Sequence, residues 1–271
     1  MTILVTGATA NIGRKVVDQL LAGGATDVRA LTTDPARAAL PAGVDVARGY
    51  LRRLETLPAA MAGVDRLYLA PTPDTVTGVL AIARDAGVRY VVDLSGEPES
   101  WWGSVNDAVE ASGMEWTHLW PGDFMENTFM WAGQIRRTGG VREPYPAAAS
   151  APIAMDDIAA VAATALLGDG HAGKSYSLAG PQILTRAELL EQIGNALGRD
   201  LDFVQASRAE TIEALAPEMG ETAEWYVDNV LESYTERPDA PTGSVERITG
   251  RPATTFAEWV SRHTAEFTPG T

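Results

Sequence analysis

The segment that most constrains this chain is its beginning, Ile3–Arg14, where an apolar strand breaks into a turn that carries two glycines. The residues after the turn predict a helix from Asn11 to about Ala22. Amides at the start of a helix and the positive end of its dipole attract phosphate, and small residues let a dinucleotide pyrophosphate approach the backbone. Gly7 and Gly13 enclose Ala10 at the midpoint, which departs from the usual G-x-G-x-x-G spacing.

The context of this turn supports a nucleotide site. A strand precedes the turn, a helix follows it, and a second strand-like run, Asp27–Leu31, comes about 20 residues later, as a dinucleotide-binding unit requires. We therefore predict that the amides of Ala10–Ile12 bind phosphate. The alternative is a tight turn that serves only the packing of the helix on the sheet.

Composition and charge exclude several classes of function. The net charge of −15 disfavours a nucleic-acid partner, because such binding depends on lysine and arginine that neutralise phosphates. The absence of cysteine excludes disulfides, thiolate nucleophiles and zinc–thiolate sites. The three histidines are scattered, so we expect no metal site. Because no apolar run approaches the roughly 20 residues that span a bilayer, and no leader pattern opens the chain, we expect a cytoplasmic protein without membrane contact.

Strand-like and helix-like runs alternate through the first two thirds of the chain. This alternation predicts an α/β fold of the Rossmann type, a doubly wound parallel sheet whose ligands lie outside the carboxyl ends of the strands. The strand-like runs after the first two are Val44–Ala47, Asp65–Ala70, Val88–Leu94 and Glu115–Trp120.

The pattern changes toward the carboxyl end, where helical runs dominate. A capping box, Thr185–Glu188, precedes an amphipathic run to Leu197, and two further helical runs follow. We predict a small, mostly helical carboxyl-terminal lobe that binds the substrate. The expected division is 1–170 for the dinucleotide-binding domain and 171–271 for this lobe, which interweave near the boundary.

Three motifs carry a resemblance to a known family. They are TGATANIGR at residues 6–14, WTHLWPGDFMEN at 116–127 and SVERITGRPATTF at 244–256. With these motifs the chain resembles the NmrA-like group of atypical short-chain dehydrogenases/reductases over nearly its whole length. The resemblance implies a Rossmann-type domain that binds NAD(P) and a small substrate lobe. Members of the group include quinone and other carbonyl reductases as well as redox-sensing regulators.

Several family positions for the cofactor are altered here. Ala10 replaces the middle glycine of the turn, Thr33 replaces a basic residue and Thr32 an acidic one, while Tyr50 replaces an aspartate near the adenine and can stack on its ring. Arg14 and Arg37 favour NADP over NAD, although Arg37 fits a solvated surface residue equally well. The predicted cofactor-binding residues are Gly7, Thr9, Ala10, Asn11, Ile12, Gly13, Thr32, Thr33, Arg37, Tyr50, Ala70, Pro71 and Ser95.

The tyrosine–lysine pair that typical members of the wider superfamily use for acid catalysis is absent, because no tyrosine has a lysine four residues later. Ser95 stands where the superfamily's catalytic serine lies, and it fits either a catalytic group or a simple turn residue. Asp123 is the alternative proton carrier, and its competing interpretation is the N-cap of a helix over 124–134. His118 lies within a strand and is expected to be a core residue.

Aromatic residues near the predicted strand ends indicate a flat, apolar substrate pocket. Because hydride transfer needs orientation and a dry pocket more than a side-chain catalyst, we expect an NAD(P)H-dependent oxidoreductase that reduces a planar quinone-like or conjugated carbonyl substrate. The alternatives are a redox sensor without turnover and a non-redox cyclase or dehydratase. The predicted substrate-binding residues are Trp101, Trp102, Trp120, Phe124, Asn127 and Tyr226.

Overall fold

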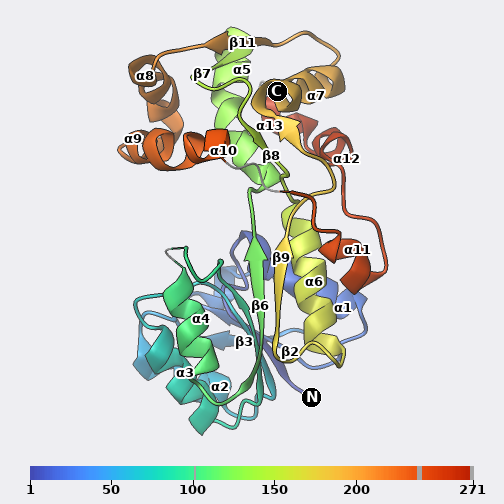
Figure 1. The fold of residues 1–271 in the computed structure, drawn as a ribbon. Helices are drawn as coiled ribbons and strands as arrows, with labels where there is room; N and C mark the ends of the chain where they lie inside the picture. Colours follow the sequence, from blue (N-terminus) through green and yellow to red (C-terminus); the bar gives the residue numbers. More distant parts are fainter. Residues whose placement is uncertain (101, 237–239, 269–271) are drawn as a thin grey trace. The chain divides into compact units, whose positions relative to one another are not determined.

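The computed structural model describes residues 1–100, 102–236 and 240–268. By packing, the chain divides into two compact units, each made of several segments (Figure 1). The first unit comprises 1–121, 155–178 and 244–251, and the second comprises 122–154, 179–243 and 252–271. The chain therefore passes between the units several times. The sequence suggested domains over 1–170 and 171–271 that interweave near the boundary.

The first unit is built on a seven-stranded parallel sheet with the strand order β3-β2-β1-β4-β5-β6-β9 (Figure 1). The chain runs outward from β1 to β3, then returns to the other side of β1 to form β4. This reversal makes the β1–β4 boundary a topological switch point, where ligands bind in doubly wound folds. The strands are β1 Ile3–Val5, β2 Val28–Thr32, β3 Asp45–Arg48, β4 Arg66–Leu69, β5 Tyr90–Leu94, β6 Glu115–Pro121 and β9 Lys174–Leu178.

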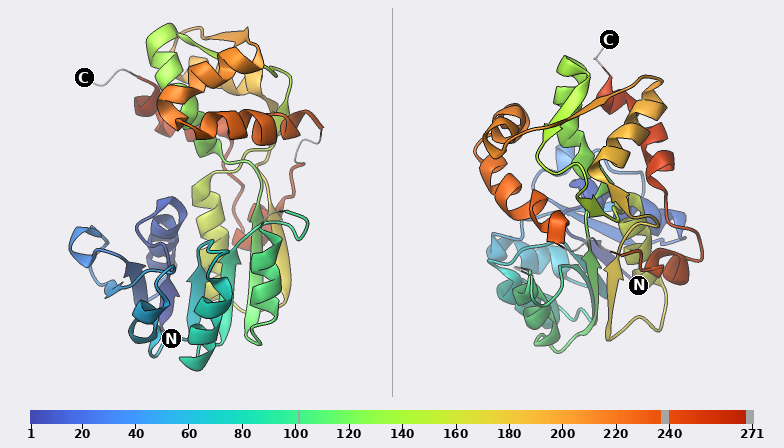
Figure 2. Two further views of the ribbon diagram at one scale, coloured as in Figure 1. Left: turned by 90° about the vertical axis from the view of Figure 1, so that its left-hand side faces the viewer. Right: turned by 45° about the horizontal axis from the view of Figure 1, so that its top comes forward.

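Helices cover both faces of this sheet, which confirms the Rossmann-type architecture (Figure 2). On one face, α2, α3 and α4 bury leucine and valine side chains against β1, β4 and β5. On the other face, α1 packs along α6. The bounds are α1 Asn11–Ala22, α2 Leu57–Met61, α3 Val76–Asp85, α4 Gly103–Glu110, α6 Met155–Leu167 and α11 Ser244–Thr249, with short helices η1 Pro35–Arg37 and η2 Leu54–Thr56.

The second unit is mostly helical, as the sequence predicts. Two small sheets join its helices, one from β7 and β11 in parallel and one from β8 and β10 in antiparallel pairing. Capping boxes start α7, α8 and α12, each with a Ser or Thr bonded to the Glu three residues later. The elements are η3 Met125–Trp131, α5 Ala132–Thr138, β7 Gly140–Glu143, β8 Ala149–Ser150, β10 Leu184–Thr185, α7 Arg186–Leu197, β11 Asp202–Gln205, α8 Arg208–Met219, α9 Thr222–Tyr226, η4 Val227–Leu231, α10 Ser233–Glu236, α12 Phe256–Arg262 and α13 Thr264–Phe267.

A buried ion pair holds the centre of the second unit. Glu143 on β7 is fully buried and accepts hydrogen bonds from Nε and Nη2 of the Arg186 guanidinium, the second at 2.9 Å from Nη2 to Oε1. The indole Nε1 of Trp131 donates to the same Oε1 at 2.6 Å, and the guanidinium lies 4.6 Å from the centre of the Trp131 ring. These hydrogen bonds and the ring contact replace the water that would otherwise solvate the two charges.

We predict that Glu143→Leu lowers the free energy of unfolding by about 3–5 kcal/mol, because it leaves the Arg186 charge buried without its partner. Adding Arg186→Met should recover most of that loss, since an apolar pair of similar volume needs no solvation. Chemical denaturation followed by tryptophan fluorescence measures both variants. The matched control is Glu224→Ala, which breaks an exposed pair with Arg208 and should cost at most about 1 kcal/mol. A Glu143→Leu cost as small as that of the control would contradict the prediction.

Candidate functional site

The turn after β1 forms a cradle for an anion. Gly7 adopts φ +60°, a conformation that favours glycine, and its carbonyl accepts a hydrogen bond from the Ala10 amide at 2.8 Å. The first bond within helix α1 runs from the Arg14 amide to the Ala10 carbonyl, so the amides of Asn11–Gly13 precede the intrahelical ladder. The Ala10 amide is thus already used in the turn, and the donors available for phosphate are those of Asn11–Gly13.

Gly13 allows this cradle to form. A Cβ atom at this position would lie 2.1 Å from the Gly7 carbonyl oxygen and 2.6 Å from its carbon, both backbone atoms. Any side chain would therefore push the start of α1 away from the end of β1. Close helix–strand packing, which the sequence suggested for this glycine, is its structural role.

Thr6 joins the two strands at the switch point, a role that the sequence analysis missed. Its buried hydroxyl donates to the Tyr68 carbonyl at 2.9 Å and accepts from the Ala70 amide at 2.8 Å. These bonds fix the carboxyl end of β4 beside that of β1. A threonine directly before the glycine turn is the sequence signal that could have indicated this role.

A cavity of about 340 Å³ opens beside the turn, at the carboxyl ends of β1, β2, β3 and β4. Seven predicted cofactor residues line it, namely Gly7, Thr9, Thr32, Thr33, Tyr50, Ala70 and Pro71. Five lining residues were not in the predicted set, namely Leu31, Gly49, Leu51, Arg52 and Thr72. The remaining predicted residues, Ala10, Asn11, Ile12, Gly13, Arg37 and Ser95, are not among those that line it.

The structure gives Arg14, Arg37 and Arg52 positions that differ from those expected from the sequence. Arg14 donates to the Ala39 carbonyl at 2.7 Å and pairs with Asp18, so it fastens the loop after η1 to helix α1. Arg37 is exposed at the end of η1 and does not line the cavity. Arg52 lines the cavity and lies 3.8 Å from Asp74, with most of its side chain in solvent. Arg52 is thus the guanidinium that can reach a ligand in this cavity.

Tyr50 presents a largely exposed ring to the same cavity, with 43% of its surface accessible. Its backbone is fixed, because the Tyr50 amide donates to the Thr56 hydroxyl at 3.0 Å and Tyr50 bridges to Arg53. A fixed backbone with a free aromatic face suits stacking on a planar ring.

Next along the sheet edge, Asn106 organises the end of β5. Its side-chain oxygen accepts from the Ser95 hydroxyl at 2.7 Å and from the Trp120 indole at 3.2 Å, while its amide donates to the Gly96 carbonyl at 2.6 Å. Ser95 and Trp120 were both predicted as site residues, and this buried asparagine of α4 brings them together. Asn106 was not among the predicted site residues.

Below Ser95, a buried carboxylate–imidazole pair joins β5 to β6. His118 Nδ1 lies 2.6 Å from Asp93 Oδ2, and both side chains are fully buried, which confirms the expected core position of His118. Burial raises the pKa of the Asp93 carboxyl, while His118 and the nearby Ser95 hydroxyl act in the opposite direction. An aspartate in the otherwise apolar run of β5 was the available signal for this pair.

In the second unit, Asp123 fastens a turn. Its two carboxylate oxygens accept from the Asn127 amide and the Ser150 hydroxyl, each at 2.8 Å. The expected single helix over 124–134 with Asp123 as N-cap is wrong, because η3 begins after Phe124 and α5 follows it. A role for Asp123 as a proton carrier stays a prediction.

The other predicted substrate residues lie in different surroundings. Phe124 bridges to Ile153, and Tyr226 is buried in the core of α8 and α9, where burial raises the pKa of its hydroxyl. Trp102 begins α4 and packs against the core of the first unit. Trp101 lies outside the described residues. Substrate binding by this set remains a prediction.

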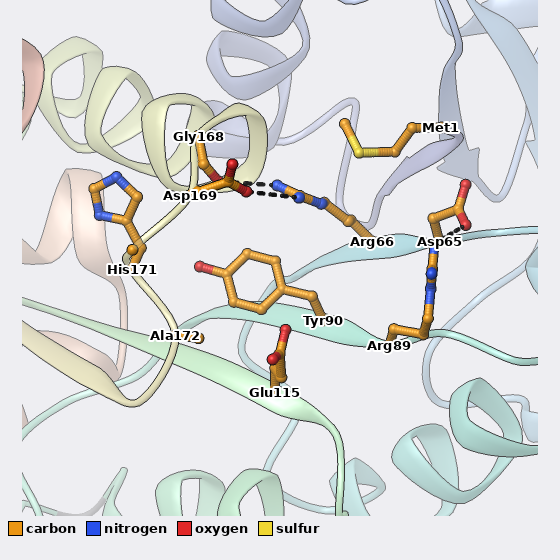
Figure 3. A pocket seen from close by; sticks show the side chains of 11 residues that line it. Met1, Asp65, Arg66, Arg89, Tyr90, Glu115, Gly168, Asp169, His171 and Ala172 are labelled. Atoms are coloured by element: carbon orange, nitrogen blue, oxygen red, sulfur yellow. Dashed lines mark hydrogen bonds and ion pairs between the residues drawn. The ribbon is translucent and has the colours of Figure 1, made fainter.

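A second cavity, of about 210 Å³, lies at the opposite, amino-terminal edge of the sheet (Figure 3). Arg66 crosses it toward Asp169, donates to the carbonyls of Leu166 and Gly168, and lies over the Tyr90 ring. Since its guanidinium is occupied by these partners, Arg66 acts as a brace between β4 and the end of α6. This edge is away from the carboxyl ends where ligands bind in such folds.

Across residues 1–100, 102–236 and 240–268, no group of three His, Asp or Glu side chains is arranged to hold a metal ion. Within the same ranges, no helix combines the length and the apolar character that crossing a bilayer requires.

Comparisons with known proteins agree with this geometry. A family model described as NAD(P)H-binding matches residues 7–96, which contain the turn, the cavity and Ser95. The (4-alkanoyl-5-oxo-2,5-dihydrofuran-3-yl)methyl phosphate reductase of Streptomyces griseus is 36% identical over 285 residues, which cover 98% of this chain and 99% of the relative. The NAD(P)H azoreductase of Xenophilus azovorans is 38% identical over 285 residues, with the same coverage of both chains.

A solved structure supports the fold over the whole chain. The NADPH-dependent quinone oxidoreductase of Escherichia coli is 25% identical and superposes with a TM-score of 0.85, over 97% of this chain and 99% of that one. Full-length relatives above 30% identity and the phosphate cradle at the switch point together establish the family. The chain belongs to the NmrA-like group of atypical short-chain dehydrogenases/reductases and is an NAD(P)H-dependent reductase of that group.

Proposed function

We propose that this reductase uses NADPH to reduce planar, conjugated acceptors of the quinone or conjugated-carbonyl type. The observation that carries the proposal is the pairing of Ser95 and Trp120 on Asn106, on the carboxyl edge of the sheet. An indole face beside a hydroxyl suits a flat π-system that bears an oxygen. The relatives' names agree in kind, because an azo group, a quinone and an unsaturated lactone are all conjugated acceptors.

The residues of the turn fit a dinucleotide. The amides of Asn11–Gly13 would hold the pyrophosphate, since the space that a Cβ at Gly13 would fill stays free for close approach. Tyr50 would stack on the adenine, while Thr33 and Arg52 would bind the 2′-phosphate of the ribose. When bound, the nicotinamide supplies the hydride, and the protein supplies orientation and exclusion of water.

Gly13→Ala should weaken NADPH binding at least about tenfold, or ~1.4 kcal/mol, because its Cβ forces the start of α1 away from the Gly7 carbonyl. Ala10→Gly is the matched control in the same turn, and it should leave binding unchanged or tighter. Fluorescence titration with NADPH measures both affinities, and thermal melts report any loss of folding. Abolished binding in Ala10→Gly would contradict this account of the turn.

Arg52→Ala should weaken NADPH binding by about 10- to 100-fold and leave NADH binding unchanged, since a charge-assisted hydrogen bond contributes roughly 1.5–3 kcal/mol. Arg37→Ala removes the same charge outside the cavity and serves as the control. Titrations of each variant with both cofactors check the prediction. A selective loss of NADPH binding in Arg37→Ala, and none in Arg52→Ala, would indicate that Arg37 binds the 2′-phosphate and that Arg52 does not.

The wild-type protein should oxidise NADPH in the presence of menadione, followed by the loss of NADPH absorbance. Trp120→Ala should raise the KM for menadione about two- to tenfold with NADPH affinity retained, because a stacked aromatic pair contributes roughly 0.5–1.5 kcal/mol. Trp116→Ala is the matched control, since Trp116 lies on the same face of β6 near its amino end and also stacks on His118. NADPH binding without turnover across a panel of quinones, enones and azo dyes would contradict the proposal and favour a sensor. Failure to bind NADPH would favour a non-redox enzyme.

A further inference from the structure

Four side chains capable of carrying a proton follow one another from the carboxyl edge of the sheet to solvent. Ser95 lies at the end of β5, and Asp93 lies two residues earlier on the same face of that strand. His118, on β6, is the partner of Asp93 across the two strands, at 2.6 Å from Nδ1 to Oδ2. On the far side of the imidazole, His118 Nε2 lies 3.5 Å from Glu110 Oε1 on α4.

The middle of this series is sealed from water. The side chains of Asp93 and His118 have no accessible surface, whereas Glu110 is about half exposed at 54%. The indoles of Trp116 and Trp120 stack on either side of the imidazole, with ring centres 4.2 Å and 6.1 Å away. Glu110 is thus the solvent-exposed group of this series that lies next to the imidazole.

Two buried atoms of the pair are not fully used. Asp93 Oδ1 and His118 Nε2 each lack a hydrogen-bond partner among the residues that the structure describes. A pair that served only to join β5 to β6 would leave these desolvated atoms at a cost of about 1–3 kcal/mol each. One belongs to the carboxyl that interacts with the Ser95 hydroxyl, and the other lies 3.5 Å from Glu110 Oε1.

The remaining charged and titratable neighbour is Tyr68 on β4. Its fully buried hydroxyl also lacks a partner among the described residues, and its pKa is raised by burial first and by the charge of Asp93 second. Burial also raises the pKa of Asp93, so this carboxyl holds a proton more readily than an exposed one.

We propose that Glu110, His118, Asp93 and Ser95 form a relay that delivers the proton which a conjugated acceptor requires after hydride transfer. The inference rests on the proposed function, because it assumes that the acceptor meets Ser95. It also explains how a reductase without the tyrosine–lysine pair completes its reaction in a dry site.

The proton balance of the relay is simple. Hydride from NADPH forms a new C–H bond on the acceptor, whose oxygen gains negative charge as NADP⁺ forms. The Ser95 hydroxyl turns from Asn106 and gives its proton to that oxygen, and Asp93 reprotonates Ser95. His118 gives its Nδ1 proton to Asp93 and gains one at Nε2 from Glu110, which takes a proton from solvent. Ser95 alone touches the acceptor, and the other three groups act through it.

Asp93→Asn tests the relay with little change of shape, because the amide fills the same space but cannot pass a proton. With NADPH and menadione, we expect kcat to fall about 10²-fold, the contribution typical of general acid catalysis, with NADPH affinity unchanged. The decline of kcat with rising pH and the solvent deuterium isotope effect on kcat should both disappear in this variant. Glu110→Gln should lower kcat less, and small buffer acids should restore its rate, since position 110 is open to solvent.

Thr117→Val is the matched control for a buried polar change on β6. The Thr117 hydroxyl is fully buried and bonded to Tyr90 and to the His171 carbonyl, on the face of the sheet opposite His118. It should lower the melting temperature without altering the pH profile or the isotope effect.

The outcomes separate the relay from the proposed function. An active wild type whose pH profile and isotope effect persist in Asp93→Asn would overturn the relay and leave the function intact. A wild type that binds NADPH but reduces no acceptor would overturn both. Equal changes of pH profile in Thr117→Val and Asp93→Asn would assign the effect to general destabilisation and also overturn the relay.

Discussion

The close contact between helix α1 and strand β1 at Gly13 positions the glycine turn and the cavity beside it. Two backbone segments lie so close there that a single Cβ would meet the Gly7 carbonyl at 2.1 Å. Because the helix starts at that point, its first amides, those of Asn11–Gly13, lie next to the turn that follows β1. Thr6 then ties the same strand end to β4, so the anion cradle and the switch point of the sheet coincide.

Each unit also contains a buried carboxyl group bonded to a nitrogen-bearing side chain, and the two pairs differ in an informative way. The Glu143–Arg186 pair is closed, since Trp131 supplies a further hydrogen bond and a ring face. In the Asp93–His118 pair, Asp93 Oδ1 and His118 Nε2 each lack a hydrogen-bond partner among the described residues. Fully satisfied networks stabilise a fold, whereas an unsatisfied buried group is costly unless it serves another purpose. This contrast separates a structural pair from one suited to move protons.

The cavity beside the glycine turn takes its charged and aromatic lining from a loop. Arg14 donates a hydrogen bond to the carbonyl of Ala39, a loop residue with the unusual φ of +46°. Arg52, two residues after the tyrosine that replaces an aspartate, lines the cavity instead. The guanidinium in the lining of this cavity thus comes from the loop after β3, while Thr32 at the end of β2 and Thr33 after it complete the lining on that side.

The sequence by itself determined the elements whose signals are local. Alternating apolar runs, the glycine turn and the capping box identified the parallel sheet, the first helix and the helical second unit, because strand and helix periodicity and capping act within a few residues. The same local reasoning named seven of the twelve residues that line the cavity, since these lie at or shortly after the ends of strands.

Only the tertiary structure decided which distant residues meet. Asn106 gathers Ser95 and Trp120, Asp93 meets His118 across two strands, and Glu143 meets Arg186 over 43 positions of sequence. The segments of the two units likewise alternate along the chain, so no single boundary in the sequence separates them. These pairings depend on strand order and on helix packing, which join residues far apart in the chain and leave no periodic trace in the sequence.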